Sequence, residues 1–184
     1  MPEPPEPVAQ RPAPADAATV ETARLRLRAR TLADLEPIVA MDANPAVRRF
    51  IGGPLDPAAH REEVRRNIIG GRPEPHASWA VEWHDRPGLL GLCGLSPSAE
   101  TGSTQIGWRL LPHAWGCGVA TEAAGAVLAR ALGPLGLAVV TALIHPGNAA
   151  SIRVAEKIGM MRVDVVRFRG VPQLVYRGVR EDMA

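Results

Sequence analysis

Several short stretches of the chain alternate hydrophobic and polar residues, and each of them predicts a β-strand. In the stretch 24–29, leucine and alanine alternate with arginine, which is typical of a strand with one buried face. The same period of two recurs at 79–83, at 89–95 after the turn DRPG, and at 105–112. These four segments predict strands that pair mainly in antiparallel fashion.

The arginines at 24, 26 and 28 have two explanations. They form a row that could contact phosphate, or they are the solvated face of a half-exposed strand. Alternation of this kind more often marks a solvated face. We therefore expect these three side chains to lie in water.

Longer stretches near the start of the chain have the spacing of helices. Thr31 is suited to cap a helix that carries Leu35 and Ile38 on its buried face, and Asn44-Pro45 is expected to break this helix. A second helix starts at Asp56-Pro57, where proline fits the first helical position. Its many charged residues predict that it is largely exposed.

The second half of the chain opens with a helical pattern over 113–132 that has glycines near its start. The run 137–144 is continuously apolar, as expected of a strand that is buried on both faces. A further helix ends at Gly159, and the segments 162–168 and 173–180 close the chain as a hairpin. The order of these elements predicts an α+β fold around a mixed sheet.

The first residues differ in composition from the rest. Six prolines stand within the first fourteen residues, and so many prolines favour an extended coil over a packed element. We expect residues 1–20 to be a disordered proline-rich tail and residues 21–184 to be a single domain. With 184 residues, 46% of them hydrophobic, the chain is long enough for one core.

Composition and charge exclude several classes of protein. The 21 basic and 19 acidic residues give a net charge of +2, which does not indicate a nucleic-acid-binding protein. Two cysteines without metal-ligand spacing predict neither a disulfide framework nor a metal site. No stretch reaches about 18 apolar residues, and the first residues lack the features of a signal peptide. We expect a cytoplasmic protein with no membrane or nucleic-acid partner.

The most informative local motif is WGCGVATEA, which stands between a predicted strand and a predicted helix. Gly116 and Gly118 allow a tight turn that aims backbone N–H groups and a helix N-terminus at one anion. The motif is neither GxGxxG nor GxxxxGK[ST], which disfavours a dinucleotide fold and a P-loop kinase. Cys117 in this turn is either a nucleophile or a structural residue, and we expect the structural role.

Four motifs occur in an order and spacing that resemble the GNAT superfamily of acyl-CoA N-acyltransferases, most closely its RimJ/RimL-like branch. They are TARLRLRARTLADLEPI, NPAVRRFIGG, IGWRLLPHAWGCGVATEA and NAASIRVAEKIGM. The resemblance covers about residues 21–180. It implies a GNAT-like fold, in which a mostly antiparallel twisted sheet with helices on both faces is splayed between its fourth and fifth strands.

The resemblance also implies acetyl-CoA as the cosubstrate, with no metal. The family binds the pantetheine arm along the fourth strand and the pyrophosphate in the loop that follows it. A family asparagine that reaches the arm matches Asn148. Carried over residue by residue, the implied cofactor-binding positions are Ile106, Trp108, Leu110, Leu111, His113, Trp115, Gly116, Cys117, Gly118, Val119, Ala120, Thr121, Asn148 and Ser151.

The catalytic groups are less clearly marked. Ser151 completes the NxxS pattern of this branch and is a candidate acid that protonates the leaving thiolate, or it is a serine that merely caps or packs. Gln105 stands where the family often has a glutamate, and an amide cannot accept a proton from an ammonium. Glu82, His84 or His145 could act as base through water, the acceptor could arrive as a neutral amine, or catalysis has weakened.

The function that follows is an N-acetyltransferase that moves an acetyl group from acetyl-CoA to a primary amine by direct attack in a ternary complex. The acceptor would be a protein N-terminal α-amine or a small molecule, bound near Arg48, Arg49, Phe50 and Tyr176. The alternative is a CoA-binding sensor or scaffold without turnover, which Gln105 favours. The sequence leaves a monomer and a homodimer equally open.

Overall fold

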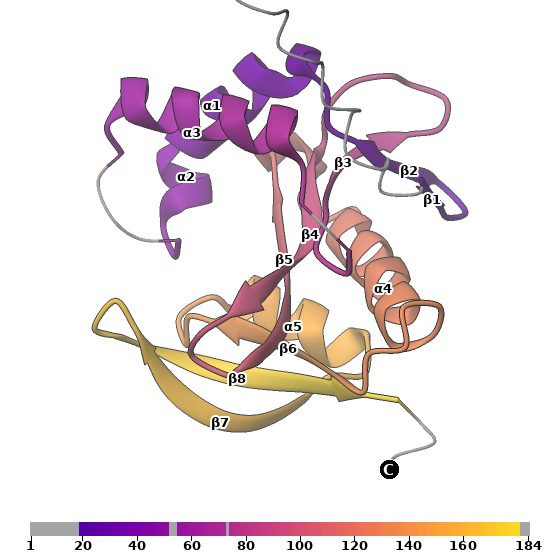
Figure 1. The fold of residues 1–184 in the computed structure, drawn as a ribbon, viewed down its shortest axis with the longest axis vertical. Helices are drawn as coiled ribbons and strands as arrows, with labels where there is room; N and C mark the ends of the chain where they lie inside the picture. Colours follow the sequence, from indigo (N-terminus) through magenta and orange to yellow (C-terminus); the bar gives the residue numbers. More distant parts are fainter. Residues whose placement is uncertain (1–18, 52–54, 73, 181–184) are drawn as a thin grey trace, which may run out of the picture.

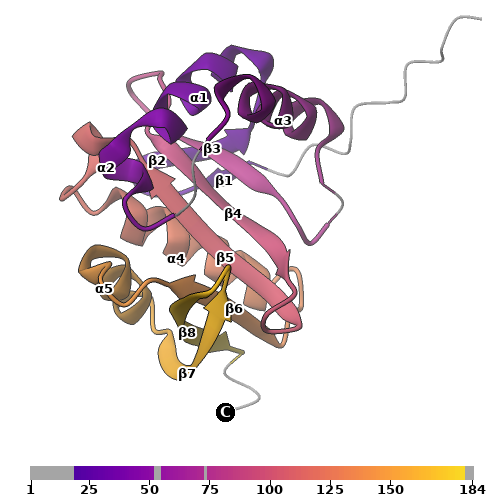
Figure 2. The same ribbon diagram turned by 90° about the vertical axis from the view of Figure 1, so that its left-hand side faces the viewer.

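The computed structural model describes residues 19–51, 55–72 and 74–180. Within these ranges one sheet of eight strands has the order β1-β2-β3-β4-β5-β6-β8-β7. All neighbouring strands are antiparallel except β5 and β6, which are parallel. Helices cover both faces of the sheet (Figures 1 and 2). This arrangement confirms the predicted α+β fold.

The bounds of the elements agree with most of the predicted segments. The strands are β1 (Val20–Glu21), β2 (Leu25–Ala29), β3 (Ser78–Trp83), β4 (Gly91–Ser98), β5 (Ser103–Leu110), β6 (Val139–Ile144), β7 (Met161–Phe168) and β8 (Val171–Val179). The helices are α1 (Leu35–Ala43), α2 (Pro45–Arg48), α3 (Pro57–Gly70), α4 (Val119–Leu132) and α5 (Ala149–Lys157), with single turns η1 (Leu32–Asp34) and η2 (Pro112–Ala114).

The alternation along the strands divides the core between the two faces of the sheet. Leu25, Leu27 and Trp79 point to the face that α4 covers and join the larger hydrophobic cluster. Ala80 and Leu92 point to the opposite face, where they pack with buried residues of α1, α2 and α3. Because both faces are covered, the central strands are held from two sides and form a rigid base for the residues at their ends.

Two helix boundaries differ from the predicted ones for a local reason. Asn44-Pro45 ends α1 as predicted, but it also starts α2, since Pro45 stands at the first helical position and the Asn44 side chain accepts a hydrogen bond from the Ala46 N–H. The helix predicted over 113–132 begins only at Val119, because Gly118 before it adopts a left-handed conformation.

The prediction of a solvated arginine row was wrong for Arg28. Its guanidinium donates two hydrogen bonds of 2.8 Å to the Asp34 carboxylate and one of 2.9 Å to Glu82. The Asp34 side chain is only 5% exposed. Arg26 lies in water, 47% exposed, beside Glu21. Alternation predicted which side of the strand these residues face, but the acids that cover Arg28 come from η1 and β3.

Residues 1–18 of the predicted tail lie outside the described residues, and Val20 already belongs to β1. In the part of the chain that the structure describes, no helix combines the length and the apolar character needed to cross a membrane.

The buried ion pair of Arg28 with Asp34 gives a first prediction. We expect Asp34→Asn to lower the free energy of unfolding by about 3 kcal/mol, because it leaves a partly buried guanidinium without its main partner. Urea denaturation monitored by circular dichroism measures this difference. As the control, Asp85→Asn removes a carboxylate that is 76% exposed beside Arg86 and is expected to change stability by less than about 0.5 kcal/mol.

The pH dependence of the same pair has a definite sign. Burial alone would raise the pKa of the Asp34 carboxyl, but hydrogen bonds from Arg28 and Thr31 outweigh burial and lower it. The stabilisation is therefore complete above the unfolded-state pKa of about 3.9 and is lost as the pH falls through the lower folded-state value. The stability gap between wild type and Asp34→Asn should shrink only below about pH 4; a gap already closing at pH 6 would contradict this account.

Candidate functional site

The sheet opens into a wedge between β5 and β6. These two strands pair at only two positions, Thr104 with Val140 and Gln105 with Thr141. Beyond Gln105, the register of β5 continues on its other side with β4 alone. The predicted splay between the fourth and fifth strands is therefore found between β5 and β6, since the short strand β1 shifts the count by one.

A loop with exposed backbone follows the open strand. Gly116 and Gly118 have φ angles of +75° and +81°, which glycine adopts without strain. Gly118 precedes α4, and no side chain caps this helix. The N–H groups of the first turn thus lack intrahelical partners and, with the positive end of the helix dipole, are suited to bind an anion.

Trp115 and Cys117 tie the loop to its surroundings. The Trp115 indole donates a hydrogen bond of 2.8 Å to the Leu110 carbonyl, although the side chain remains 47% exposed. The exposed Cys117 thiol donates to the Trp115 carbonyl at 3.2 Å. Both contacts fix the path of the chain between β5 and α4, which gives each residue a structural role here.

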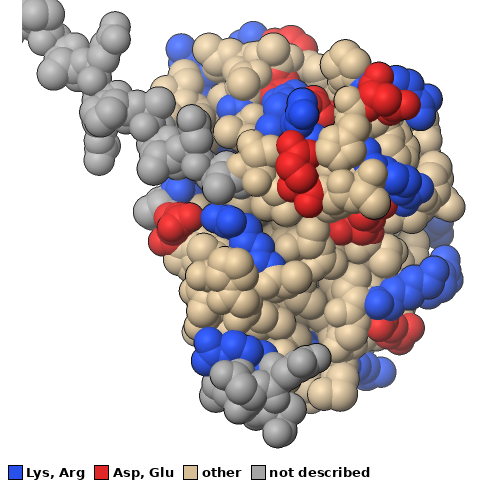
Figure 3. Space-filling model, turned by 90° about the vertical axis from the view of Figure 1, so that its right-hand side faces the viewer, with Lys and Arg blue, Asp and Glu red and all other residues tan. Residues whose placement is uncertain are grey.

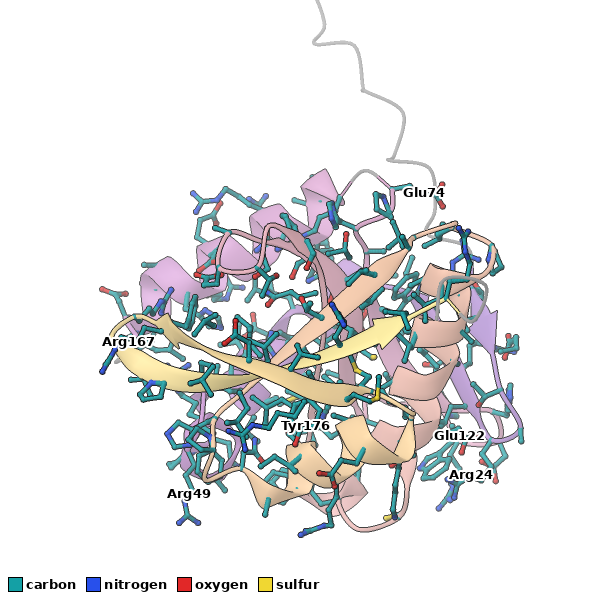
Figure 4. The ribbon with its side chains drawn as sticks, turned by 90° about the horizontal axis from the view of Figure 1, so that it is seen from below. Arg24, Arg49, Glu74, Glu122, Arg167 and Tyr176 are labelled. Carbon is teal, nitrogen blue, oxygen red and sulfur yellow. The ribbon has the colours of Figure 1, made fainter. Side chains whose placement is uncertain are left out.

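An ion-pair clamp holds the loop from the side of β2, and no sequence pattern predicted it. The Arg24 guanidinium contacts the Glu122 carboxylate through two nitrogens, at 2.7 Å each, and donates to the Cys117 carbonyl at 3.2 Å. Thr22 Oγ1 donates to the same carboxylate at 2.6 Å. Figure 4 shows Arg24 and Glu122 side by side at the start of α4.

The clamp sets the charge of Glu122. Burial alone would raise the pKa of its carboxyl, but hydrogen bonds from Thr22 and Arg24 outweigh burial and lower the pKa. Glu122 therefore stays ionised beside the loop while Arg24 neutralises it. Arg24 is 48% exposed, as expected of a solvated face, but its guanidinium pairs with Glu122 and contacts the loop at Cys117.

The start of α5 lies after β6, on the other side of the wedge. Asn148 caps α5, because its side-chain oxygen accepts a hydrogen bond of 3.1 Å from the Ser151 N–H. The Ser151 hydroxyl makes no hydrogen bond to any described residue and is half-buried. Asn148 thus has the structural role that its residue type predicts, while the Ser151 hydroxyl is available to a ligand.

The three candidate bases lie at different distances from the wedge along the sheet. Glu82 is on β3, two strands from β5, and is paired with Arg28 at 2.9 Å. His84 follows β3, with its Nε2 2.9 Å from the Thr22 carbonyl. His145 directly follows β6, and its ring lies 5.1 Å from that of Phe50. Only His145 borders the opening.

Gln105 stands at the apex of the wedge. It is the last residue of β5 that pairs with β6, and its side-chain nitrogen donates a hydrogen bond of 3.2 Å to Ser96 Oγ. Tyr176, expected near the acceptor, is instead only 3% exposed, with its hydroxyl 3.4 Å from Glu156 on α5 (Figure 4). Burial is the main reason why the pKa of its phenol is raised.

The charge distribution offers no large field of one sign on the face that carries α4, where acidic and basic side chains are interspersed (Figure 3). Across residues 19–51, 55–72 and 74–180, no three His, Cys, Asp or Glu side chains are grouped so that they could hold a metal ion. The features that stand out are therefore the open strand edge and the uncapped loop, both suited to a long ligand with an anionic end.

Comparison with known proteins identifies the family. A family model described as an acetyltransferase (GNAT) domain matches residues 24–161. The chain is 35% identical to the uncharacterized protein YkkB of Bacillus subtilis over 158 residues, which covers 84% of this chain and 92% of that protein. It is 28% identical to the uncharacterized N-acetyltransferase YoaA of the same organism, over 80% of this chain and 85% of the relative.

Solved structures agree with this assignment. An acetyltransferase from Agrobacterium tumefaciens superposes with a TM-score of 0.77 at 26% identity, covering 89% of this chain and 95% of the other. A spermidine N-acetyltransferase from Vibrio cholerae, crystallised with CoA and spermine, has the same fold, with a TM-score of 0.67 at 20% identity over 85% and 94% of the two chains. The chain belongs to the GNAT family of acetyltransferases.

Proposed function

We propose that the protein is an N-acetyltransferase of the RimJ/RimL-like kind that transfers the acetyl group of acetyl-CoA to a primary amine. The observation that carries this proposal is the wedge between β5 and β6, which leads directly into the uncapped glycine loop before α4. An open strand edge can pair with the amides of a pantetheine arm. The loop N–H groups can bind the pyrophosphate at the arm's other end.

The described residues fit such a cosubstrate. The backbone of β5 from Ile106 to Leu110 would accompany the arm, and the amides from Gly116 to Thr121 would face its phosphates. Acetyl-CoA, when bound, supplies a thioester carbon that an amine can attack. A backbone N–H of β5 would then stabilise the oxyanion, and the Ser151 hydroxyl would donate a hydrogen bond to the leaving sulfur.

The proton of the attacking amine has no obvious acceptor in the wedge. Gln105 is an amide, and Glu82 is held by Arg28. The His145 Nδ1 accepts a hydrogen bond of 3.0 Å from the Gly147 N–H, so its lone pair is already engaged, and taking a proton there would break this bond. We infer that the acceptor arrives as a neutral amine and releases its proton to water after attack.

The proposed role of Ser151 gives the central experiment. Acetyl-CoA turnover, followed by thiol release, would be measured against amino acids, amino-acid amides, polyamines, aminoglycosides and amino-terminal peptides. Ser151→Ala is expected to lower kcat about 100-fold, the usual size of a general-acid effect, while the Kd of CoA from calorimetry stays unchanged. Ser78→Ala, on β3 and therefore two strands away from the wedge, is the matched control and should behave as wild type.

Two results would count against this assignment. An equal kcat for Ser151→Ala and wild type would make Ser151 a packing residue. CoA binding without transfer to any amine of the panel would instead favour the alternative of a sensor or scaffold, for which the amide at position 105 gives the structural reason.

The inferred fate of the proton gives a prediction on pH. For two acceptors whose amines differ in basicity, kcat/KM should rise with pH and level off near the pKa of each acceptor's own amine, because only the neutral form attacks. His145→Asn should leave both profiles in place. A plateau at one common pH for both acceptors would contradict this and reveal an enzyme base.

The Arg24 clamp gives a prediction on cofactor binding. Arg24→Gln is expected to raise the Kd of CoA about tenfold, since it releases the loop and leaves the Glu122 carboxylate unpaired near the phosphates. Arg26→Gln is a close control, because Arg26 is equally exposed, 47% against 48%, but pairs with Glu21 away from the loop. Calorimetric titration with CoA tests both variants. The same Kd for both would show that the Arg24 clamp does not contribute to CoA binding.

A further inference from the structure

A buried charged cluster lies on the face of the sheet that α1–α3 cover, and the proposed acetyl transfer gives it no role. Asp42 on α1 is 2% exposed. Its Oδ2 lies 3.0 Å from His60 Nε2 on α3, and its Oδ1 lies 3.0 Å from Arg109 Nε on β5. Arg48 on α2 donates to the Asp42 backbone carbonyl at 3.5 Å. Residues of α2, α3 and β5 thus contact Asp42, and two of them, His60 and Arg109, contact its carboxylate.

The cluster has an excess of positive charge. The Arg109 guanidinium pairs with the Asp42 carboxylate, and the charge of the nearby Arg48 guanidinium also acts on Arg109. Arg30 lies close enough that its pKa is lowered to about 10, chiefly by burial and further by the charges of Arg72 and Arg109. The only other acid that acts on Arg109 among the described residues is Glu63, whose side chain is 64% exposed. An anion brought into this cluster would therefore meet net attraction.

Arg109 has unused donors. Its Nε forms an ion pair with Asp42 but not an aligned hydrogen bond, since neither atom has a hydrogen-bond partner in the described part of the chain. Its two Nη groups make no hydrogen bond to a described residue, and a third of the side chain is exposed. A guanidinium held at Nε with free Nη groups is arranged to bind a carboxylate.

The position of Arg109 relates the cluster to the reaction. It lies on the part of β5 that β6 does not pair, four residues after the apex at Gln105. Its strand neighbour Leu92 packs with the residues of α1 and α3, so Arg109 faces that layer. Gly107 points to the same side, is exposed, and has no heavy atom within 4 Å of an ideal Cβ. Open space therefore adjoins Gly107, two residues before the partly exposed Arg109 on the same side of β5.

The rim of this space is formed by α2 and the end of β6. Phe50 follows α2, and its ring meets that of His145 at 5.1 Å across the opening. Figure 2 shows α2 near the carboxyl end of β5. An acceptor that reaches the wedge from the layer of α1–α3 would pass Arg48 and Arg109 on its way.

We propose that Arg109, assisted by Arg48, binds a carboxylate of the acceptor, so that the protein acetylates small amines that carry a carboxylate group, such as amino acids. Asp42 and His60 are positioning residues, which hold the Arg109 guanidinium with its Nη edge toward the acceptor. The inference rests on the proposed acetyl transfer and specifies its substrate class. None of these four residues takes part in the bond-making step. In that step the neutral amine nitrogen gains the acetyl group, the sulfur leaves as thiolate and one proton goes from the nitrogen to solvent.

The experiment compares each amino acid with its own amide as acceptor, with acetyl-CoA fixed and thiol release as the readout. Wild type should have a kcat/KM at least tenfold higher for the acid. The amide has the less basic amine and is more often neutral, so this chemical bias works against the expected result. Arg109→Met should lose the preference through a raised KM for the acid, while kcat/KM for the amide changes less than about twofold.

Companion variants keep the result interpretable if Arg109→Met does not fold. Arg48→Met should reduce the same preference in part, and His60→Asn should raise the KM for the acid while leaving kcat unchanged. Arg26→Met, away from the cluster, should behave as wild type. Equal or better transfer to amides or polyamines in wild type would overturn the carboxylate proposal and leave acetyl transfer standing. CoA binding with no transfer to any amine would overturn both.

Discussion

One constraint governs the structure: the backbone hydrogen-bonding groups along most of the β5 edge have no partner strand. Backbone N–H and C=O groups need partners, yet β6 supplies them at only two positions before it diverges. The same strand runs into a loop whose N–H groups also lack a cap. A single extended ligand can satisfy both deficits, pairing with the strand and placing its anionic end on the helix. The backbone alone therefore favours an extended ligand with an anionic end, before any side chain is considered.

Side chains then determine the charge around the loop before α4. At the start of α4, the dipole favours Glu122 in the first turn, but a carboxylate there would repel phosphates. Arg24 and Thr22 bind that carboxylate, so the acid anchors the loop without opposing the anion. The arrangement explains why Arg24, in the turn before β2, and a glutamate nearly one hundred residues later belong to one structural unit.

Local patterns in the sequence predicted most of the strands, the glycine turn and the cap at Asn148, because each depends on neighbours a few residues away. The partners of Arg24 and Arg28 could not be predicted, since alternation assigns a residue to a face of the sheet but not to the elements that cover it. The contacts among Asp42, His60 and Arg109 could not be predicted for the same reason: His60 and Arg109 are 18 and 67 residues from their partner Asp42. Asn44-Pro45 was read as a stop only, although the residues that end one helix can cap the next.

Two half-buried arginines on the α1–α3 face, Arg28 and Arg109, form similar ion pairs but differ in how many of their nitrogens are bound. Arg28 uses every nitrogen, with Nε on Glu82, Nη1 on Asp34 and the Ala29 carbonyl, and Nη2 again on Asp34. Since each nitrogen of this group is engaged, Arg28 serves to hold the fold. Arg109 is bound through Nε alone, in an imperfect geometry. The buried Nε of Arg109 lacks an aligned hydrogen bond, and leaving a buried donor unsatisfied costs free energy. The retention of Arg109 at this position is therefore better explained by a ligand than by stability.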